Sequence, residues 1–232
     1  MRIASAWLFA LCGAAAADEP PAGVLKLTVG DYRYASFDGQ DANLRYRRGA
    51  TDAWFGFYRD PQFGSQSRAG IDTSWTLLDG VALQPSLQLA QGGFRGGSLN
   101  LQVGERWYGV AGIGRTNLRP YVNLNFDPND AVTIGAGHQA GNGASYAVTL
   151  IADDRLHTGQ RDLHFFGQWP VRDFRISTDV LHKSGRGDAG PVHAWGATLT
   201  VDFWTWFVRV ARDPKQNFTA QDALRLVAGV RF

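Results

Sequence analysis

The chain has 232 residues, of which 44% are hydrophobic, 12% aromatic and 19% charged, with a formal net charge of +2. This apolar content excludes a disordered or collagen-like chain, and the single cysteine, Cys12, excludes a disulfide scaffold. The near-neutral charge argues against a nucleic-acid partner, and the lack of a long apolar run after position 17 argues against transmembrane helices.

The first 17 residues have the pattern of a secretory signal peptide. A positively charged start is followed by the apolar segment Ile3–Leu11 and by a small-residue cleavage region, 12–17. We therefore predict that residues 1–17 are removed and that residues 18–232 form one exported domain. A buried N-terminal helix is the alternative interpretation of the apolar segment. The mature chain would contain no cysteine, so packing or backbone pairing must stabilise it.

From residue 25 onward the apolar residues recur with a period of two, which predicts strands rather than helices. In the last run, for example, Leu226, Val230 and Phe232 share one face, and Arg225 and Arg231 share the other. Such runs lie near residues 25–36, 41–47, 53–60, 69–77, 80–90, 97–103, 107–114, 118–126, 131–139, 145–152, 162–169, 173–183, 193–202, 204–212 and 222–232.

Two all-β architectures can use this pattern: a soluble sandwich with its apolar face inside, or a membrane barrel with its apolar face outside. Many runs reach the ~9–11 residues that cross a bilayer when tilted, and their polar faces carry Arg, Asp, Asn and Gln. Aromatic residues lie near the ends of runs, as expected for an interfacial girdle: Trp54, Trp107, Tyr108, Trp169, Trp204 and Trp206. The sequence predicts an all-β, transmembrane, antiparallel up-and-down β-barrel.

The number of strands follows from the connections. Fifteen runs are too many by one, because single-chain bacterial barrels have even numbers of strands. Alternating long and short connections fit two spans, not three, within 98–126, which predicts about 14 strands, with 12 and 16 as alternatives. Phe232 and the mature N-terminus are then periplasmic. The long, extracellular connections are predicted at Pro61–Ser67, Gln91–Gly96, Asp153–Arg161, Ser184–Val192 and Asp213–Gln221.

The signal peptide, the alternating spans and the aromatic C-terminal residue resemble those of Gram-negative outer-membrane β-barrels. The resemblance implies a location in the outer membrane, with outer-membrane lipid and lipopolysaccharide as partners. It also implies that the last strand is read by the barrel-assembly machinery through Leu226, Ala228, Val230 and Phe232. Two stretches, Tyr34–Tyr46 and Asp213–Phe232, are more narrowly similar to YaiO-like barrels.

The alternation also predicts which polar side chains face the lumen. They are Arg45, Asp72, Asn100, Asn123, Arg175, Asp179, Asp202, Arg209 and Arg225. Such mixed-sign residues could set a weak solute selectivity, or they could only satisfy one another as a buried polar network. The main hypothesis is a non-enzymatic narrow pore, or an export or scaffold component of the envelope, without cofactor or metal.

The alternative hypothesis is an outer-membrane lipid hydrolase. His182 and Ser184 lie two residues apart on one predicted strand, so they share a face and the imidazole could activate the hydroxyl. The pair resembles the His-x-Ser pairs of outer-membrane phospholipase A and lipid A deacylase. The deacylase pattern continues with Asn, whereas Gly185 stands here. The more ordinary interpretation is two polar residues that enter a glycine-rich loop.

Overall fold

The alternating sequence folds into strands that are almost all about ten residues long. The computed structural model describes residues 25–124 and 127–232, so the predicted signal peptide lies outside the described residues. The strands are β1 (Leu25–Tyr34), β2 (Asp38–Arg48), β3 (Thr51–Asp60), β4 (Gly64–Asp72), β5 (Trp75–Leu78), β6 (Val81–Ala90), β7 (Phe94–Val103), β8 (Trp107–Thr116), β9 (Ala131–Gln139), β10 (Ser145–Asp153), β11 (Arg161–Val171), β12 (Phe174–Gly187), β13 (Gly190–Asp202), β14 (Trp206–Asp213) and β15 (Ala223–Arg231). Two short 3₁₀ helices, η2 (Gln91–Gly93) and η3 (Gln216–Phe218), lie between strands.

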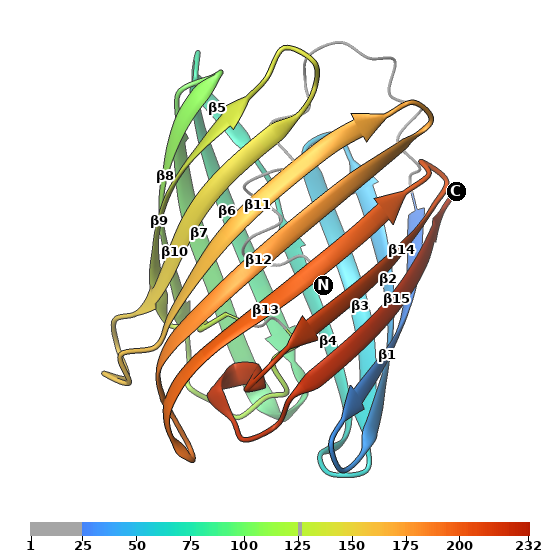
Figure 1. Cartoon of the computed structure of the whole chain (residues 1–232), viewed down its shortest axis with the longest axis vertical. Helices are drawn as coiled ribbons and strands as arrows, with labels where there is room; N and C mark the ends of the chain where they lie inside the picture. The colour runs from blue at the N-terminus through green and yellow to red at the C-terminus, as the bar shows by residue number, and fades with distance from the viewer. Residues whose placement is uncertain (1–24, 125–126) are drawn as a thin grey trace.

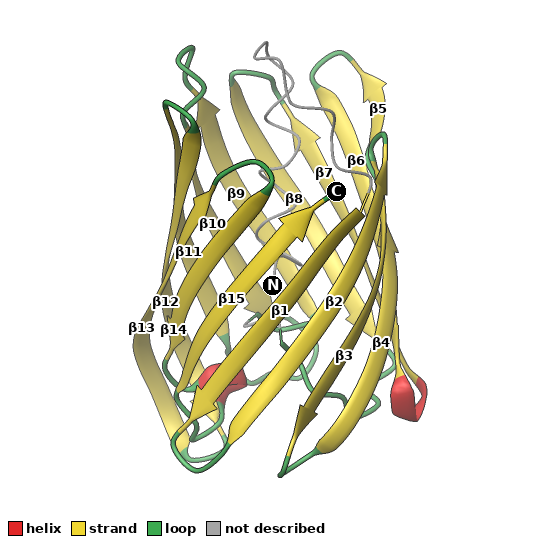
Figure 2. Ribbon diagram, turned by 90° about the vertical axis from the view of Figure 1, so that its right-hand side faces the viewer, coloured by secondary structure: helices red, strands yellow, loops and turns green. Residues whose placement is uncertain are grey.

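The strands form one closed antiparallel ring (Figures 1 and 2). Neighbours in sequence are neighbours in the sheet, and β15 returns to pair with β1 from Lys26↔Arg231 to Tyr34↔Ala223. Both β4 and β5 pair with β6, so together they make one crossing of the wall. The ring therefore has fourteen crossings, as predicted, and leaves no free edge.

The break between β4 and β5 has a local cause in Pro85 of β6. Asp72 pairs with Ser86 and Trp75 pairs with Leu83, so the interruption lies opposite Pro85. The Thr73 N–H donates to the Pro85 carbonyl at 3.2 Å. In an antiparallel ladder the returning bond would come from the N–H of residue 85, which proline lacks.

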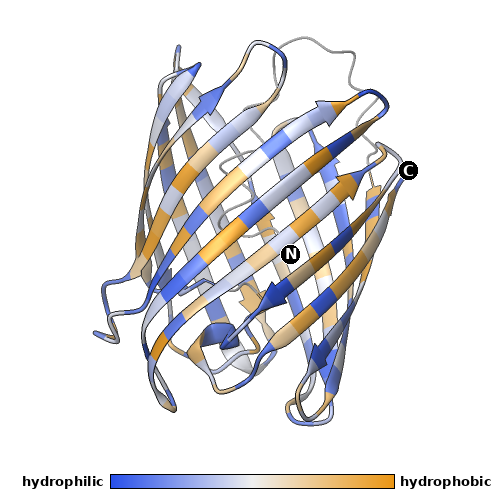
Figure 3. Cartoon of the chain, viewed as in Figure 1, coloured by the Kyte–Doolittle hydropathy of each residue, from blue (hydrophilic) through white to orange (hydrophobic). Residues whose placement is uncertain are grey.

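The outer surface of the ring is apolar. Leu226, Val230 and Phe232 are exposed on β15 and beyond its end, whereas their neighbours Arg225 and Val227 are buried in the interior. Figure 3 shows the same alternation of orange and blue along many strands. The outward-facing, exposed apolar residues include Leu44, Phe55, Phe57, Leu87, Leu99, Leu101, Ile134, Val148, Trp195, Leu199, Val208 and Leu224. This arrangement is that of a transmembrane barrel and not of a soluble sandwich.

Only part of the predicted aromatic girdle faces outward. Trp107 and Trp206 are 72% and 45% exposed, and the Trp169 indole donates a hydrogen bond to the Tyr146 hydroxyl. Trp54 and Tyr108 are instead buried on the inner faces of β3 and β8, so the girdle prediction was wrong for these two residues.

The two ends of the barrel differ. At one end, here the short-turn end, lie the C-terminus and brief turns such as 79–80 and 172–173. At the other, here the loop end, lie the longer connections, including 154–160 and 214–222 (Figure 2). The predicted long loop Ser184–Val192 was wrong in extent, because β12 and β13 pair as far as Gly187↔Gly190.

The described part of the apolar run at 118–126, up to Leu124, is not a strand, so the prediction of a strand-like run there was wrong. The prediction of two spans within 98–126 is confirmed, and the two spans are β7 and β8. Pro120 interrupts the run and cannot donate to a sheet, and Leu118 has a left-handed φ of 58°. Asn123, predicted on a strand facing the lumen, therefore lies in the loop between β8 and β9. No helix among the described residues is long and apolar enough to cross a membrane.

Candidate functional site

The connection between β8 and β9 enters the lumen from the loop end. Its described residues, 117–124 and 127–130, are called the inner loop below. Leu124 is completely buried and packs with Tyr32 of β1 and Tyr58 of β3. An apolar side chain that would face lipid in a strand is thus buried in the interior of the barrel.

The Gln66 side chain holds the inner loop to β4. Its amide nitrogen donates to the Val122 carbonyl at 3.1 Å, and its amide oxygen accepts from the Val122 N–H at 2.8 Å. The Gln66 side chain therefore supplies the two backbone hydrogen bonds that a neighbouring strand would otherwise give to Val122, which lies outside the sheet. A second contact comes from the loop after β14, where the Asn217 side-chain amide donates to the Asn123 carbonyl at 2.6 Å.

An imidazole connects the inner loop to the opposite wall. His164 Nε2 lies 2.8 Å from a carboxylate oxygen of Asp127, and its Nδ1 lies 3.0 Å from one of Asp179. Only the doubly protonated ring can donate to both carboxylates at once. The arrangement joins the inner loop to β11 and β12 through one side chain.

The base of the inner loop is held by a further carboxylate and a ring stack. Asp130 accepts hydrogen bonds from the Thr116 hydroxyl at 2.5 Å and from Arg155 at 2.8 Å. Tyr121 stacks on Phe94 with ring centroids 3.9 Å apart. Burial raises the pKa of Tyr121 above its ordinary value, so its phenol remains neutral.

A fully buried ion pair lies beside the inner loop. Lys183 of β12 and Asp213 of β14 are 2.5 Å apart, and both side chains are 0% exposed. Asp162 of β11 is also completely buried, and neither of its carboxylate oxygens has a hydrogen-bond partner among the described residues. Over residues 25–124 and 127–232, no three His, Cys, Asp or Glu side chains form a group that could hold a metal.

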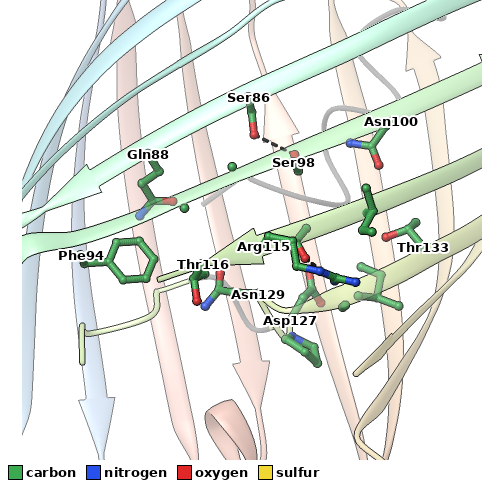
Figure 4. Close-up of a pocket in the computed structure, with 17 residues that line it drawn as sticks. Ser86, Gln88, Phe94, Ser98, Asn100, Arg115, Thr116, Asp127, Asn129 and Thr133 are labelled. Atoms are coloured by element: carbon green, nitrogen blue, oxygen red, sulfur yellow. Dashed lines mark hydrogen bonds between the residues drawn. The ribbon is translucent and has the colours of Figure 1, made fainter. Parts of the chain in front are cut away.

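A pocket of about 70 Å³ remains between the inner loop and the wall formed by β6–β10 (Figure 4). This volume has room for on the order of five water molecules. On the wall side, the Ser86 and Ser98 hydroxyls are hydrogen-bonded at 2.7 Å. On the loop side lie Asp127 and Asn129. The pocket lining therefore combines hydroxyl and amide side chains with apolar residues such as Phe94 and Ile151, and it includes the charged residues Arg115 and Asp127.

The lumen has two chemically different walls. Between the ends of the barrel, the described inner faces of β6–β10 carry uncharged residues, among them Gln84, Ser86, Gln88, Ser98, Asn100, Gln102, Gly112, Thr133, Gly135 and Thr149. Ion pairs are found on the remaining strands, for example Arg68 with Asp41 at 2.6 Å. A solute in the bore would meet charges on one side and neutral polar groups on the other.

The structure places eight of the nine predicted lumen residues on inner faces of strands. They are Arg45, Asp72, Asn100, Arg175, Asp179, Asp202, Arg209 and Arg225, with Asn123 in the inner loop as described. They do not form one cluster. Asp179 contacts His164, Asp202 binds Arg231 at 2.5 Å, and Arg209 donates to the Thr200 hydroxyl at 3.0 Å.

The residues that organise the centre are not among the predicted lumen residues. Neither His164 nor Lys183 was predicted to face the lumen, although Lys183 lies between His182 and Ser184. Strand parity could have found Lys183, because it shares a face with Asp179. Nothing in the sequence indicates that Asp127 reaches His164, because that contact depends on the path of the inner loop.

His182 and Ser184 face outward near the loop end, on the same side of β12 as the exposed Val180. The imidazole lies against the Trp195 indole, with ring centroids 4.6 Å apart. Among the described residues, it makes no hydrogen bond to Ser184 or to a carboxylate.

No protein-family model and no curated protein sequence matches this chain. Among solved structures, it is similar to the outer-membrane protein Omp33 of Acinetobacter baumannii, at 8% identity and a TM-score of 0.59, over 91% of this chain and 99% of that one. The NanC porin has a TM-score of 0.47 at 9% identity, covering 89% of this chain and 100% of that one. The KdgM porin has a TM-score of 0.45 at 10% identity, covering 89% and 99%. At this identity the similarity to Omp33 shows the fold alone: a closed, fourteen-strand outer-membrane β-barrel.

Proposed function

We propose that this protein is a non-enzymatic, narrow pore of the outer membrane that passes small polar solutes. The observation that carries the proposal is the inner loop, which is anchored inside a closed barrel and leaves a pocket of mixed polar and apolar lining against the neutral wall. A barrel of this size encloses more space than side chains alone fill. The inner loop narrows that space, so its anchors determine the bore.

Single-channel conductance in planar bilayers tests the proposal. The full-length mature protein should give discrete conductance steps. Gln66→Ala removes both hydrogen bonds that hold Val122, so the loop should be less tightly held and the conductance higher. Gln62→Ala is the matched control, because Gln62 is exposed in the loop between β3 and β4.

Asp127→Asn gives a second, independent test at the imidazole. An amide cannot pair with an imidazolium as a carboxylate does, so this variant should also raise the conductance or its noise. Asp188→Asn, at an exposed position in the turn between β12 and β13, should leave both unchanged. If wild type and both anchor variants gave no conductance steps over many insertions, the open channel would be rejected and a scaffold role favoured.

We also propose that the last strand is recognised by the barrel-assembly machinery and that lipid and lipopolysaccharide surround the wall. The outward position of Leu226, Val230 and Phe232 supports this, since these side chains form an exposed apolar face on and just beyond the last strand. The finer similarity to YaiO-like barrels is likewise a proposal, and it rests on Tyr34–Tyr46 and Asp213–Phe232 alone.

A further inference from the structure

A row of three cations crosses three neighbouring strands near the short-turn end. Lys26 of β1 is the direct register partner of Arg231 on β15 and of Arg45 on β2. All three belong to the inner-facing set of their strands. Like charges placed directly opposite each other destabilise a sheet, so other groups must compensate this row.

Carboxylates compensate the two ends of the row. Asp52 lies 3.8 Å from Arg45 and 2.8 Å from Arg47. Asp202 makes a two-pronged contact with Arg231, at 2.5 and 3.0 Å. Each of these arginines is thereby fixed in direction, with its guanidinium held at the lumen wall.

Three cationic side chains lie around the ring of Phe207, near β15. Lys26 Nζ lies 4.4 Å from the ring centroid, and the guanidinium carbons of Arg231 and Arg209 lie 5.6 and 5.7 Å from it. Cation–π contacts hold cationic groups without neutralising them. Three positive charges from β1, β14 and β15 thus converge on one buried ring.

Cations also exceed carboxylates in this half of the lumen. Among the described residues, the inner faces near the short-turn end carry the cations Lys26, Arg45, Arg47, Arg175, Arg209 and Arg231 and the carboxylates Asp52, Asp72 and Asp202. The opposite excess is found toward the loop end, where the described inner-facing residues include the carboxylates Asp41, Asp60, Asp127, Asp162, Asp179 and Asp213 and the basic residues Arg68, His164, Lys183 and Arg225. Charge is therefore segregated along the bore.

We propose that Lys26, Arg209 and Arg231, arranged around Phe207, form a binding site for small oxyanions that carry at least two negative charges. Carboxylate and phosphate groups fit equally, because ammonium and guanidinium groups bind both through charge-assisted hydrogen bonds. Lys26 and Arg209 would supply these bonds, while Arg231 stays paired with Asp202 and adds positive charge beside them. A role in transport rests on the proposed pore, but binding at this site does not require one.

Calorimetric titration of the mature, full-length protein in uncharged detergent tests binding directly. The probes are inorganic pyrophosphate and succinate, with neutral succinamide as the comparison. Wild type should bind both anions and not the amide. Lys26→Gln removes one cation without leaving Asp202 unpaired, and it should weaken binding about tenfold, the size expected for one charge-assisted contact.

Arg33→Gln is the matched control. Arg33 is on the same strand, but it faces outward with its side chain 62% exposed, so its loss should leave anion binding unchanged. Faster gel migration of unheated samples shows that each variant is folded. Equal affinity of wild type and Lys26→Gln, or no binding of either anion to wild type, would overturn the site.

Reversal potentials across a tenfold KCl gradient separate this proposal from the pore itself. A conducting wild type should prefer chloride, and Lys26→Glu should reduce or reverse that preference. Pyrophosphate binding without conductance would keep the site and reject the pore. Conductance without anion binding or anion preference would keep the pore and reject the site.

Discussion

At the scale of single residues, the inner wall depends on aromatic rings that cover glycines. Trp54 pairs with Gly70 in register, and Tyr108 pairs with Gly137. In both pairs a Cβ on the glycine would collide with the ring of its partner. The absence of a side chain gives each large ring a place against the sheet, which explains why these aromatics lie inside and not at the lipid interface.

The pairing of Tyr108 with Gly137 predicts that a larger residue at position 137 lowers the stability of the barrel. We expect Gly137→Ala to displace the Tyr108 ring and to lower the free energy of unfolding by about 2 kcal/mol, as other overpacking changes do. Urea titration of the barrel in detergent measures it. Gly141→Ala adds the same methyl group where nothing lies within 4 Å, and an equal loss in both variants would refute the explanation.

The Lys183–Asp213 pair gives a second prediction at this scale. Asp213→Asn leaves a buried ammonium without its carboxylate, and we expect it to lower the free energy of unfolding by about 3 kcal/mol. The double substitution Lys183→Met/Asp213→Leu removes both charges and should lose less than the single variant. If the double variant had a lower free energy of unfolding than Asp213→Asn, the unpaired ammonium would not be the cause of the lost stability.

At the scale of elements, the alternation of side chains predicted most strands, because a membrane wall imposes the same two-residue period everywhere. The prediction failed where alternation is accidental. The run at 118–126 has the right spacing, but Pro120 and the side-chain amide of Gln66 keep Val122 out of the sheet. Local sequence carries no information about a partner 56 residues away, so the inner loop was not predictable.

The interruption between β4 and β5 yields a prediction about backbone pairing. Pro85→Ala supplies the missing donor opposite Thr73, and we expect the ladder to become continuous there. Amide hydrogen exchange should then show a protected amide at position 85 and slower exchange at Thr73. Pro61→Ala, in the exposed loop after β3, should leave the exchange of Thr73 unchanged. Fast exchange of the new amide would mean that another constraint causes the break.

At the scale of the whole molecule, the ring has no free edge and buries its polar groups within itself. We expect the folded protein to resist sodium dodecyl sulfate at room temperature and to migrate faster than after boiling, because closed barrels stay compact until heated. The lipid-facing charge variant Leu226→Arg should reduce the folded fraction, since a cation in the middle of the wall costs about 2–4 kcal/mol. Identical migration of heated and unheated wild type would contradict a closed barrel.

Which residues line the lumen could be derived from parity, but how they combine could not. Arg209 and Asp202 are buried on the inner faces of regular strands, where parity alone decides the side that a residue faces. Their neighbours around Phe207 come from three strands whose register depends on where the ring closes, and that closure brings together residues about two hundred positions apart. Contacts of this range are set by the complete fold.

The pairing of β1 with β15 has a consequence for the order of events during biogenesis. The earliest strand to emerge has the latest one as its permanent neighbour, over the nine residue pairs from Lys26↔Arg231 to Tyr34↔Ala223. Until β15 has been made, the edge of β1 exposes unpaired backbone amides, which could pair with other chains. The ring can therefore close only after β15 has been made.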